Sequence, residues 1–319
     1  MRRLQDVGEH RWIAHLLARL GRGGGDGRIV VGPGDDAAAV RVGRTTLLLT
    51  TDTLGEGAHF RAAWAAPRAL GRRAFAANAS DVAAMGGRPR FALLALEAPA
   101  RTPVATLDAV VAGFAAAARR AGARLVGGNV AAGPRLALTV ALVGTAPGRV
   151  VTRAGARPGD LVYVTGALGA SGAAVRRLAR GGRAALPVPP SRVEAGVALA
   201  RVAHAMIDVS DGLVQDLGHL CRASGVAAEV ALARVPVAPA CRRALGARAA
   251  EFAATAGEDY ELLVAVPPRA ARRLPALARR LPCPLTPIGR IVSGPPAVRV
   301  LDAAGRAVRL RRGGFDHFR

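Results

Sequence analysis

The apolar positions of the chain follow two periods, one typical of helices and one typical of strands. Near the amino terminus they recur at a spacing of three and four residues, which places them on one face of a helix. These positions are Trp12, Ile13, Leu16, Leu17 and Leu20. The pattern predicts an amphipathic helix that ends at Gly21, followed by a glycine-rich loop.

Beyond this loop, short β-prone apolar runs alternate with longer alanine-rich stretches. The apolar runs are residues 28–32, 45–53, 91–98, 123–128 and 135–144. The alanine-rich stretches, residues 67–86 and 102–122, predict helices because alanine has the highest helix propensity. Thr102 is predicted as the N-cap of the second helix and Pro103 as its first residue. Alternating strands and helices predict an α/β or α+β fold.

A second set of strand-like runs follows a polar stretch that contains glycine and proline, residues 145–160. These runs are residues 160–166, 206–213, 226–232, 260–267 and a pair within 297–310. A chain of 319 residues exceeds the usual size of one domain. We therefore predict two domains, residues 1–150 and residues 151–319.

Two features indicate a soluble, cytoplasmic protein. No apolar run reaches the roughly 18 residues of a membrane span, and the first twelve residues lack the apolar core of a signal peptide.

The cysteines Cys221, Cys241 and Cys283 are widely spaced, without the short Cys or His spacings of zinc and redox sites. We expect all three to be unreactive thiols.

The formal net charge of +23 raises the possibility of a nucleic-acid-binding protein. However, all 45 basic residues are arginine and are scattered along the chain, as compositional bias would produce. Seven Phe and two Tyr are too few for a platform on which bases stack. We predict no nucleic-acid or membrane partner, because attraction of nucleotide phosphates is a sufficient use for the charge.

Half of the 22 acidic residues are concentrated in five short segments, at strand ends or at joins between strand and helix. The segments are GPGDDAA (32–38), TTDTLGEGAHF (50–60), NASDVAAMGG (78–87), DVSDGLVQD (208–216) and GEDYE (257–261). Clustered carboxylates need a cation, and oxygen ligands between small residues suit Mg²⁺. Their glycines allow backbone N–H groups to approach phosphates. Together the segments predict a Mg²⁺–nucleotide site.

Any one of these segments has a simpler explanation, because Asp before Gly is common in turns and Asp or Ser often caps helices. Asp216, Asp259 and Glu261 in particular suit structural roles. The chain also lacks lysine, a P-loop, the motifs of protein kinases and a nucleophile elbow. Phosphoryl transfer would therefore depend on metal ions and arginines, as a loose transition state allows.

In order and spacing, these motifs resemble those of the thiamine-monophosphate kinases. That family is a branch of the superfamily of aminoimidazole ribonucleotide synthetase, selenophosphate synthetase and a hydrogenase-maturation dehydratase. The resemblance runs from residues 8–20 to 313–318 and includes the five acidic segments, GGN (127–129) and TRAGARPGD (152–160). It implies a two-domain fold, a homodimer formed through amino-terminal sheets, and phosphorylation of thiamine monophosphate by ATP with Mg²⁺.

The resemblance also implies a role for individual residues. The positions that match magnesium ligands, direct or through water, are Asp36, Thr50, Thr51, Asp52, Asp81, Asn129, Asp208 and Asp211. Those that match ATP contacts are Gly128, Asn129, Arg153 and Ser210; those around thiamine monophosphate are His59, Glu258 and Phe315. Asp52, Asp81 and Asp211 are the predicted catalytic residues.

Two positions depart from the family pattern. Asn129 stands where aspartate is usual, and Phe315 where tyrosine or tryptophan is common. Simpler roles remain open for three positions: His59 as a strand-end cap, Phe315 as core packing and Arg153 as a solvated charge.

Three alternatives to the kinase remain open. A sister enzyme of the same superfamily would bind ATP similarly, but no Cys precedes Cys221 and none lies near the carboxy terminus. An RNA-binding protein would not explain the acidic clusters. A degenerate, non-catalytic homologue is the alternative that Asn129 favours. For an active enzyme we predict direct in-line transfer without a phospho-enzyme.

Overall fold

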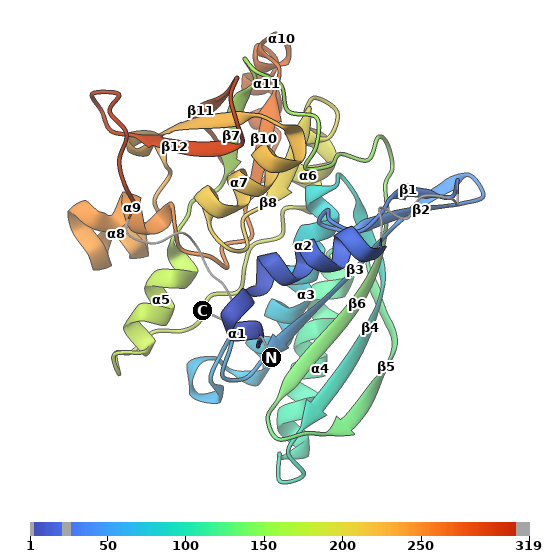
Figure 1. The fold of residues 1–319 in the computed structure, drawn as a ribbon. Coiled ribbons are helices and arrows are strands. Elements are labelled where there is room, and N and C mark those ends of the chain that lie inside the picture. The colour runs from blue at the N-terminus through green and yellow to red at the C-terminus, as the bar shows by residue number, and fades with distance from the viewer. Residues whose placement is uncertain (1–2, 21–26, 311–319) are drawn as a thin grey trace.

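The strands lie in two separate sheets. In the computed structural model, which describes residues 3–20 and 27–310, these residues form two six-stranded sheets (Figure 1). This arrangement confirms the mixed α/β class. The predicted boundary near residue 150 falls between the last strand of the first sheet and the first strand of the second.

The first sheet has the strand order β1-β2-β3-β6-β4-β5. Its strands are β1 (Ile29–Val31), β2 (Ala38–Val42), β3 (Thr45–Gly55), β4 (Arg88–Ala98), β5 (Arg124–Ala132) and β6 (Ala137–Thr145). Only β4 and β5 run parallel, because helix α4 (Val104–Arg120) connects them. Helices α3 (Pro67–Ala84) and α4 pack on one face and bury alternate side chains such as Leu94 and Val140.

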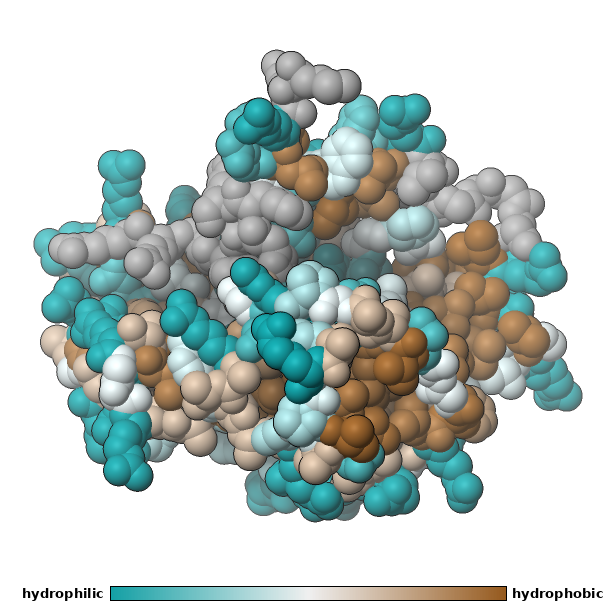
Figure 2. Space-filling model, turned by 90° about the horizontal axis from the view of Figure 1, so that it is seen from below, coloured by the Kyte–Doolittle hydropathy of each residue, from teal (hydrophilic) through white to brown (hydrophobic). Residues whose placement is uncertain are grey.

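In the part of the chain that the structure describes, no helix covers the opposite face of this sheet. Leu49, Phe91 and Leu93 lie on it and are 39%, 52% and 48% exposed. Seen from below, hydrophobic side chains gather in one part of the molecular surface (Figure 2). An uncovered apolar sheet face of this kind marks an interaction surface.

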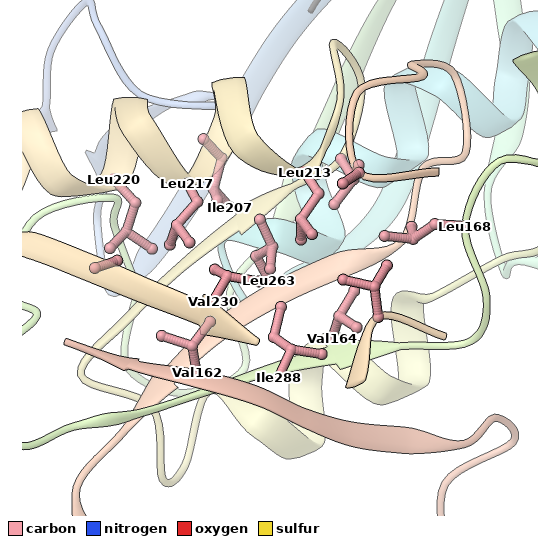
Figure 3. Packing of buried hydrophobic residues seen from close by; sticks show 14 of the residues in the cluster. Val162, Val164, Leu168, Ile207, Leu213, Leu217, Leu220, Val230, Leu263 and Ile288 are labelled. Atoms are coloured by element: carbon pink, nitrogen blue, oxygen red, sulfur yellow. The ribbon is translucent and has the colours of Figure 1, made fainter. Parts of the chain in front are cut away.

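The second sheet has the order β12-β9-β11-β7-β10-β8. Its strands are β7 (Leu161–Thr165), β8 (Ala205–Asp208), β9 (Ala227–Ala231), β10 (Leu262–Val266), β11 (Leu285–Val292) and β12 (Ala297–Leu301). Helix α7 (Leu213–Ser224) packs on one face, and Figure 3 shows Leu213, Leu217 and Leu220 pointing from it onto the strands. Helix α6 (Val193–Leu199) packs on the other face, together with the end of α3.

The remaining helices are short and peripheral. They are α1 (Leu4–Val7), α2 (Glu9–Leu20), α5 (Ala170–Leu178), α8 (Pro239–Leu245), α9 (Ala249–Ala253), α10 (Pro268–Ala271) and α11 (Leu274–Ala278). Helix α2 confirms the predicted amino-terminal helix, although Gly21 lies outside the described residues. Among the described residues, no helix has the length and apolarity to cross a bilayer.

Three details of the predicted secondary structure were wrong or missing. Pro103, rather than Thr102, is the N-cap of α4, which begins at Val104. Strand β2 was missed because it begins within an acidic, glycine-containing motif, and β11 because Pro287 and Gly289 interrupt it. In residues 297–310, β12 forms, but its predicted partner makes only the Leu301–Ala307 bridge.

Helices α3 and α4 pack unusually closely. A Cβ atom added at Gly71 would lie 1.9 Å from the Val110 carbonyl oxygen, and one added at Gly113 would lie 2.0 Å from that of Arg68. Both positions therefore require glycine. On another side of α3, a Cβ at Gly196 of α6 would lie 2.1 Å from the Ala83 oxygen. Glycine thus fixes α3 against α4 and against a helix of the carboxy-terminal half.

Candidate functional site

Three carboxylates from distant parts of the chain meet where α3 passes between the two sheets. Asp36 lies just before β2, Asp81 lies near the end of α3, and Asp208 ends β8. One oxygen atom of each lies within 4.8 Å of the others. The fold therefore brings together three of the predicted magnesium ligands.

Hydroxyl groups orient two of these carboxylates. Thr50 Oγ1 donates a hydrogen bond to Asp81 Oδ2 at 2.7 Å, and Ser80 Oγ donates one to Asp208 Oδ2 at 2.7 Å. The Ser80 bond joins α3 to the carboxy-terminal half of the chain. Each carboxylate keeps a second oxygen for another ligand.

The electrostatics of the cluster require a positive charge. Burial, and then the charges of Asp208 and Asp36, raise the pKa of Asp81 well above its ordinary value. Burial and the Asp36 charge likewise raise the pKa of Asp208 to about 7. Asp36 Oδ2 is buried and has no hydrogen-bond partner among the described residues. A hard cation such as Mg²⁺ fits this site, because it would bind the unpaired oxygen and neutralise the carboxylates.

Arg153 is the basic residue that faces the cluster. Its Nη2 lies 2.7 Å from Asp36 Oδ1, and its backbone N–H donates to Asp35 Oδ2 at 3.1 Å. Burial, followed by repulsion from Asp36, raises the pKa of Asp35 to about 6. Arg153 is thus fixed beside the candidate metal site and does not extend into solvent. An ATP contact would require this fixed position.

Asp52 and Thr51 lie on β3 beside Thr50. Asp52 is exposed, and its charge contributes to the raised pKa of Asp81. Thr51 Oγ1 donates to the Val140 carbonyl oxygen at 2.8 Å. Within residues 3–20 and 27–310, no strand pairs with the far half of β3, from Thr50 to Gly55, on the β2 side.

A second group of side chains lies at the start of α7. Ligand atoms of Asp211, Asp216 and His219 approach within 4.8 Å of one another. Asp216 accepts the backbone N–H groups of Gly212 and Asp211 at 2.9 and 3.1 Å, so it supports the turn that presents Asp211. Ser210 lies in the same turn, and its carbonyl oxygen accepts the Glu258 N–H at 2.6 Å.

Glu258 belongs to a strained loop beside this turn. Its φ of 65° and that of Tyr260, 53°, lie in the left-handed region that non-glycine residues rarely adopt. The Glu258 carboxylate faces the guanidinium of Arg73 on α3. His59 Nδ1 accepts the Gly55 N–H at 3.0 Å, which supports a role at the end of β3. Phe315 lies outside the described residues.

The other two acids of the GEDYE segment have structural partners. Asp259 accepts the backbone N–H of Gly169 at 2.5 Å, at the start of α5. Glu261 forms a buried ion pair with Arg192 and accepts the Thr165 hydroxyl at 2.6 Å. These contacts agree with the structural roles proposed above for Asp259 and Glu261.

Gly128 and Asn129 lie apart from the carboxylate cluster. They belong to the edge strand β5, and the register aligns Asn129 with Ala95, Thr139 and Thr53 across the sheet. Three strand spacings separate Asn129 from Thr53, or about 14 Å. The aligned Asn129 side chain is on the uncovered face, whereas Asp81 lies on the helical face. A Cβ at Gly128 would lie 1.9 Å from the Leu94 carbonyl oxygen, so this glycine also has a packing role.

Sequence reasoning counted Asp35 among the acids of the GPGDDAA segment without giving it a role of its own, and it gave no role to Ser80 or Arg73. Ser80 and Asp35 adjoin predicted ligands, so their motifs contained a signal. No sequence pattern distinguished Arg73 from the other arginines, because the chain contains 45 of them.

Comparisons with known proteins place the chain in a family. The model of the AIR synthase related protein N-terminal domain matches residues 34–150, and that of the C-terminal domain matches residues 157–301. A thiamine-monophosphate kinase of Mycobacterium tuberculosis is 36% identical over 93% of this chain and 89% of its own length. One from Escherichia coli K12 is 34% identical over 98% of both chains.

Solved structures are also similar. A structure described as AaThiL complexed with AMPPCP and TMP superposes with a TM-score of 0.85, at 33% identity and over 99% of both chains. The hydrogenase maturation protein HypE of E. coli superposes with a TM-score of 0.69, at 26% identity, over 83% of this chain and 85% of its own.

Proposed function

The chain belongs to the thiamine-monophosphate kinase family, and we propose that it transfers the γ-phosphoryl group of ATP to thiamine monophosphate. The observation that carries this proposal is the Asp36, Asp81 and Asp208 cluster with its unpaired buried oxygen, in a chain similar to these kinases over its whole length. The related structure that holds AMPPCP and TMP supports ATP as the co-substrate. We expect the reaction to occur in the cytoplasm, where ATP is abundant.

The proposed reaction is a direct displacement. A phosphate oxygen of thiamine monophosphate attacks the γ-phosphorus, the bond from that phosphorus to the bridging oxygen of ADP breaks, and ADP leaves with the electron pair. None of the three cysteines is among the residues assigned to the site, and we assign the Ser80 and Thr50 hydroxyl groups, which donate to Asp208 and Asp81, to orienting these carboxylates rather than to nucleophilic attack. Arg153, fixed beside Asp36, is placed to attract the phosphates. Glu258 and His59 would contact the thiamine part.

Mg²⁺ would be held by Asp36, Asp81 and Asp208, with Thr50, Thr51, Asp52 and Asp211 around them. When bound, it supplies the positive charge that the polyphosphate and the carboxylates need. The chain's own contribution is to fix these oxygens before the substrates arrive, on α3, beside the start of β2, in the middle of β3 and at the end of β8. This arrangement favours transfer through positioning.

We further propose that the enzyme is a homodimer that pairs through the uncovered face and free edge of the amino-terminal sheet. Leu49, Phe91 and Leu93 provide the apolar surface. This proposal also accounts for Asn129, which cannot reach the carboxylate cluster of its own chain. On the shared face, Asn129 would approach the β3 edge of the partner subunit instead. The two halves, divided near residue 150, would each be a domain.

The kinase proposal is tested by incubating the purified chain with thiamine monophosphate, ATP and Mg²⁺. We expect ADP and thiamine diphosphate in equal amounts, separated by chromatography. ADP formation without thiamine diphosphate would contradict the proposal. Acid-quenched protein should retain no label from γ-labelled ATP in the absence of thiamine monophosphate; retained label would exclude direct transfer.

A degenerate, non-catalytic homologue is the second candidate, and Asn129 is the observation that favours it. This homologue would bind ATP and Mg²⁺ without forming thiamine diphosphate. Equilibrium dialysis with ATP beside the product assay separates the two candidates.

A further inference from the structure

Arg73 is a fully buried arginine within the long helix α3. The residue is 1% exposed, yet it belongs to a chain in which most arginines face solvent. Its Nη2 lies 3.1 Å from Glu258 Oε1, and its Nη1 donates to the carbonyl oxygen of Pro187. Among the described residues, Nε and Nη2 have no hydrogen-bond partner, and neither has Glu258 Oε1, so Glu258 acts as the counter-charge of this guanidinium through an ion pair without a hydrogen bond. A buried charge with a single counter-charge is strongly constrained.

The position of Arg73 on α3 relates it to the metal site. Ser80 follows seven residues later, which places both side chains on the same helix face about 10 Å apart. Ser80 contacts Asp208, and Arg73 contacts Glu258, both from the carboxy-terminal half. Helix α3 therefore holds that half at two polar points, one at the carboxylate cluster and one at the candidate substrate loop.

The backbone around Glu258 is already fixed. Its N–H donates to Ser210, its carbonyl oxygen accepts the Ser171 hydroxyl at 2.7 Å, and the Tyr260 N–H donates to Val209 at 2.8 Å. The positive φ of Glu258 is a backbone conformation that non-glycine residues rarely adopt. Only the carboxylate remains to be placed. Arg73 places it, while 25% exposure of the Glu258 side chain keeps it accessible to a ligand.

We propose that Arg73 is a positioning residue that holds the Glu258 carboxylate for recognition of the cationic, phosphate-accepting substrate. This inference rests on the proposed kinase function and adds a residue to the same site. Arg73 does not touch the substrate in this arrangement, because its guanidinium is covered by α3, Pro187 and Glu258. Its effect must pass through Glu258, and this requirement makes the proposal testable.

The experiment measures KM for thiamine monophosphate, KM for ATP and kcat in four proteins: wild type, Arg73→Met, Glu258→Gln and the double variant. Methionine resembles the aliphatic part of the arginine side chain and lacks the charged guanidinium. Arg73→Met should raise KM for thiamine monophosphate by about ten- to a hundredfold, the range typical of losing a residue that orients a ligand. KM for ATP should change by less than about twofold.

The double variant decides between positioning and direct contact. In the Glu258→Gln background, Arg73→Met should cause no further rise in KM, because the two residues act as one unit. Additive effects would overturn the proposal, as would an unchanged KM in Arg73→Met. Arg73→Lys, which keeps the charge but not the fork of donors, should restore part of the affinity. A merely structural ion pair would instead change both KM values and kcat together.

Arg72→Met is the matched control, because Arg72 is the exposed neighbour on the same helix and should show wild-type KM values. Thermal unfolding checks that each variant is folded. If Arg73→Met does not fold, Arg73→Gln replaces it, since glutamine can still donate to the Pro187 carbonyl. A wild-type protein that forms no thiamine diphosphate refutes the kinase proposal, whereas an active wild type with unchanged KM in the Arg73 variants refutes this inference alone.

Discussion

At the scale of single residues, the carboxylates of the predicted magnesium ligands differ in their surroundings, although all of them lie in similar acidic segments of the sequence. Asp81 and Asp208 are held by hydroxyl donors from Thr50 and Ser80. Asp52 is exposed on an open strand edge. Substitutions of buried and exposed members should therefore affect stability differently while both affect catalysis.

We predict that Asp81→Asn and Asp52→Asn each lower kcat by at least about a hundredfold, the usual cost of removing one electrostatic contact at a transferring group. In the metal-free protein, Asp81→Asn should not lower the melting temperature, because it removes repulsion from Asp36 and Asp208. Asp52→Asn should leave the melting temperature nearly unchanged. Near-wild-type kcat in either variant would show that the proposed metal site is wrong.

Stability of the metal-free protein should fall as pH rises from about 4 to about 7. Folding raises the pKa of Asp208 to about 7 and that of Asp35 to about 6, against 3.8 in the unfolded chain. The folded state therefore binds protons more tightly than the unfolded state. The resulting stability is present at low pH and is lost as pH passes through the folded pKa values. Asp259, whose buried carboxyl has a pKa of about 7, acts in the same direction.

Thermal unfolding in EDTA at pH 5 and pH 7.5 measures this effect, which we expect to be several degrees in magnitude. Excess Mg²⁺ should abolish or reverse the fall, because the ion binds the deprotonated carboxylates and only in the folded state. Asp208→Asn should flatten the dependence. A melting temperature that rises with pH in EDTA would contradict the assignment.

At the scale of elements, α3 organises the molecule. On this helix, Asp81 and Ser80 lie at the carboxylate cluster, Arg73 contacts Glu258, and Gly71 packs against α4. Its mainly small side chains permit close packing on several sides. The cost of disturbing this helix should therefore be larger than its modest amphipathic pattern suggests.

We predict that Gly71→Ala destabilises the protein by about 1 to 3 kcal/mol, the usual cost of overpacking. The added methyl group would meet the Val110 carbonyl at 1.9 Å, and backbone cannot move aside as a side chain can. Urea unfolding at fixed Mg²⁺ gives the change. Gly148→Ala is the control, because nothing lies within 4 Å of its added Cβ. Equal midpoints for the two variants would show that α3 and α4 adjust freely.

At the scale of the whole molecule, the uncovered sheet face should hold two subunits together. Leu93→Arg places a charge on this face, where Leu93 is 48% exposed in the single chain. Burying an unpaired charge in an interface is costly, so we expect a monomer by sedimentation. The folded monomer should also show reduced turnover. Arg101→Glu, a charge change on an exposed turn away from the sheet face, is the control, and a Leu93→Arg dimer would refute this interface.

Asn129 gives a second test at this scale. In the proposed dimer, aspartate at this position would add a negative charge near the metal site of the partner subunit, so Asn129→Asp should lower the Mg²⁺ concentration for half-maximal rate. The expected change is about five- to a hundredfold, from roughly 1 to 3 kcal/mol of interaction. KM for thiamine monophosphate should remain nearly unchanged. Superimposable magnesium titrations would show that residue 129 does not contact metal.

Whether Asn129 acts across the dimer can be measured by complementation. An Asn129→Ala chain and an Asp52→Asn chain, each weakened alone, should regain activity when dissociated and mixed. A hybrid dimer then contains one site with both native residues. Absence of recovery in confirmed hybrids would place Asn129 and Asp52 in the same site of one chain, contrary to the sheet register.

The sequence by itself determined most of the elements and the family of this protein, and it predicted the chemistry of the site. Periodicity predicted α2, α3, α4 and most strands, because each pattern depends on neighbours only a few residues away. The acidic segments predicted a magnesium and nucleotide site, since carboxylates so concentrated in an arginine-rich chain require a cation. The order of these motifs was sufficient to identify the family. These features are local in the chain.

Only the tertiary structure decided which of these groups meet. It brought Asp36, Asp81 and Asp208 together across more than half of the chain, and it placed Asn129 three strand spacings from Thr53, on the face of the sheet opposite Asp81. It also selected Arg73 from 45 arginines by burying it against Glu258. Strand order, sheet face and burial depend on contacts between residues far apart in sequence, and no short pattern encodes them.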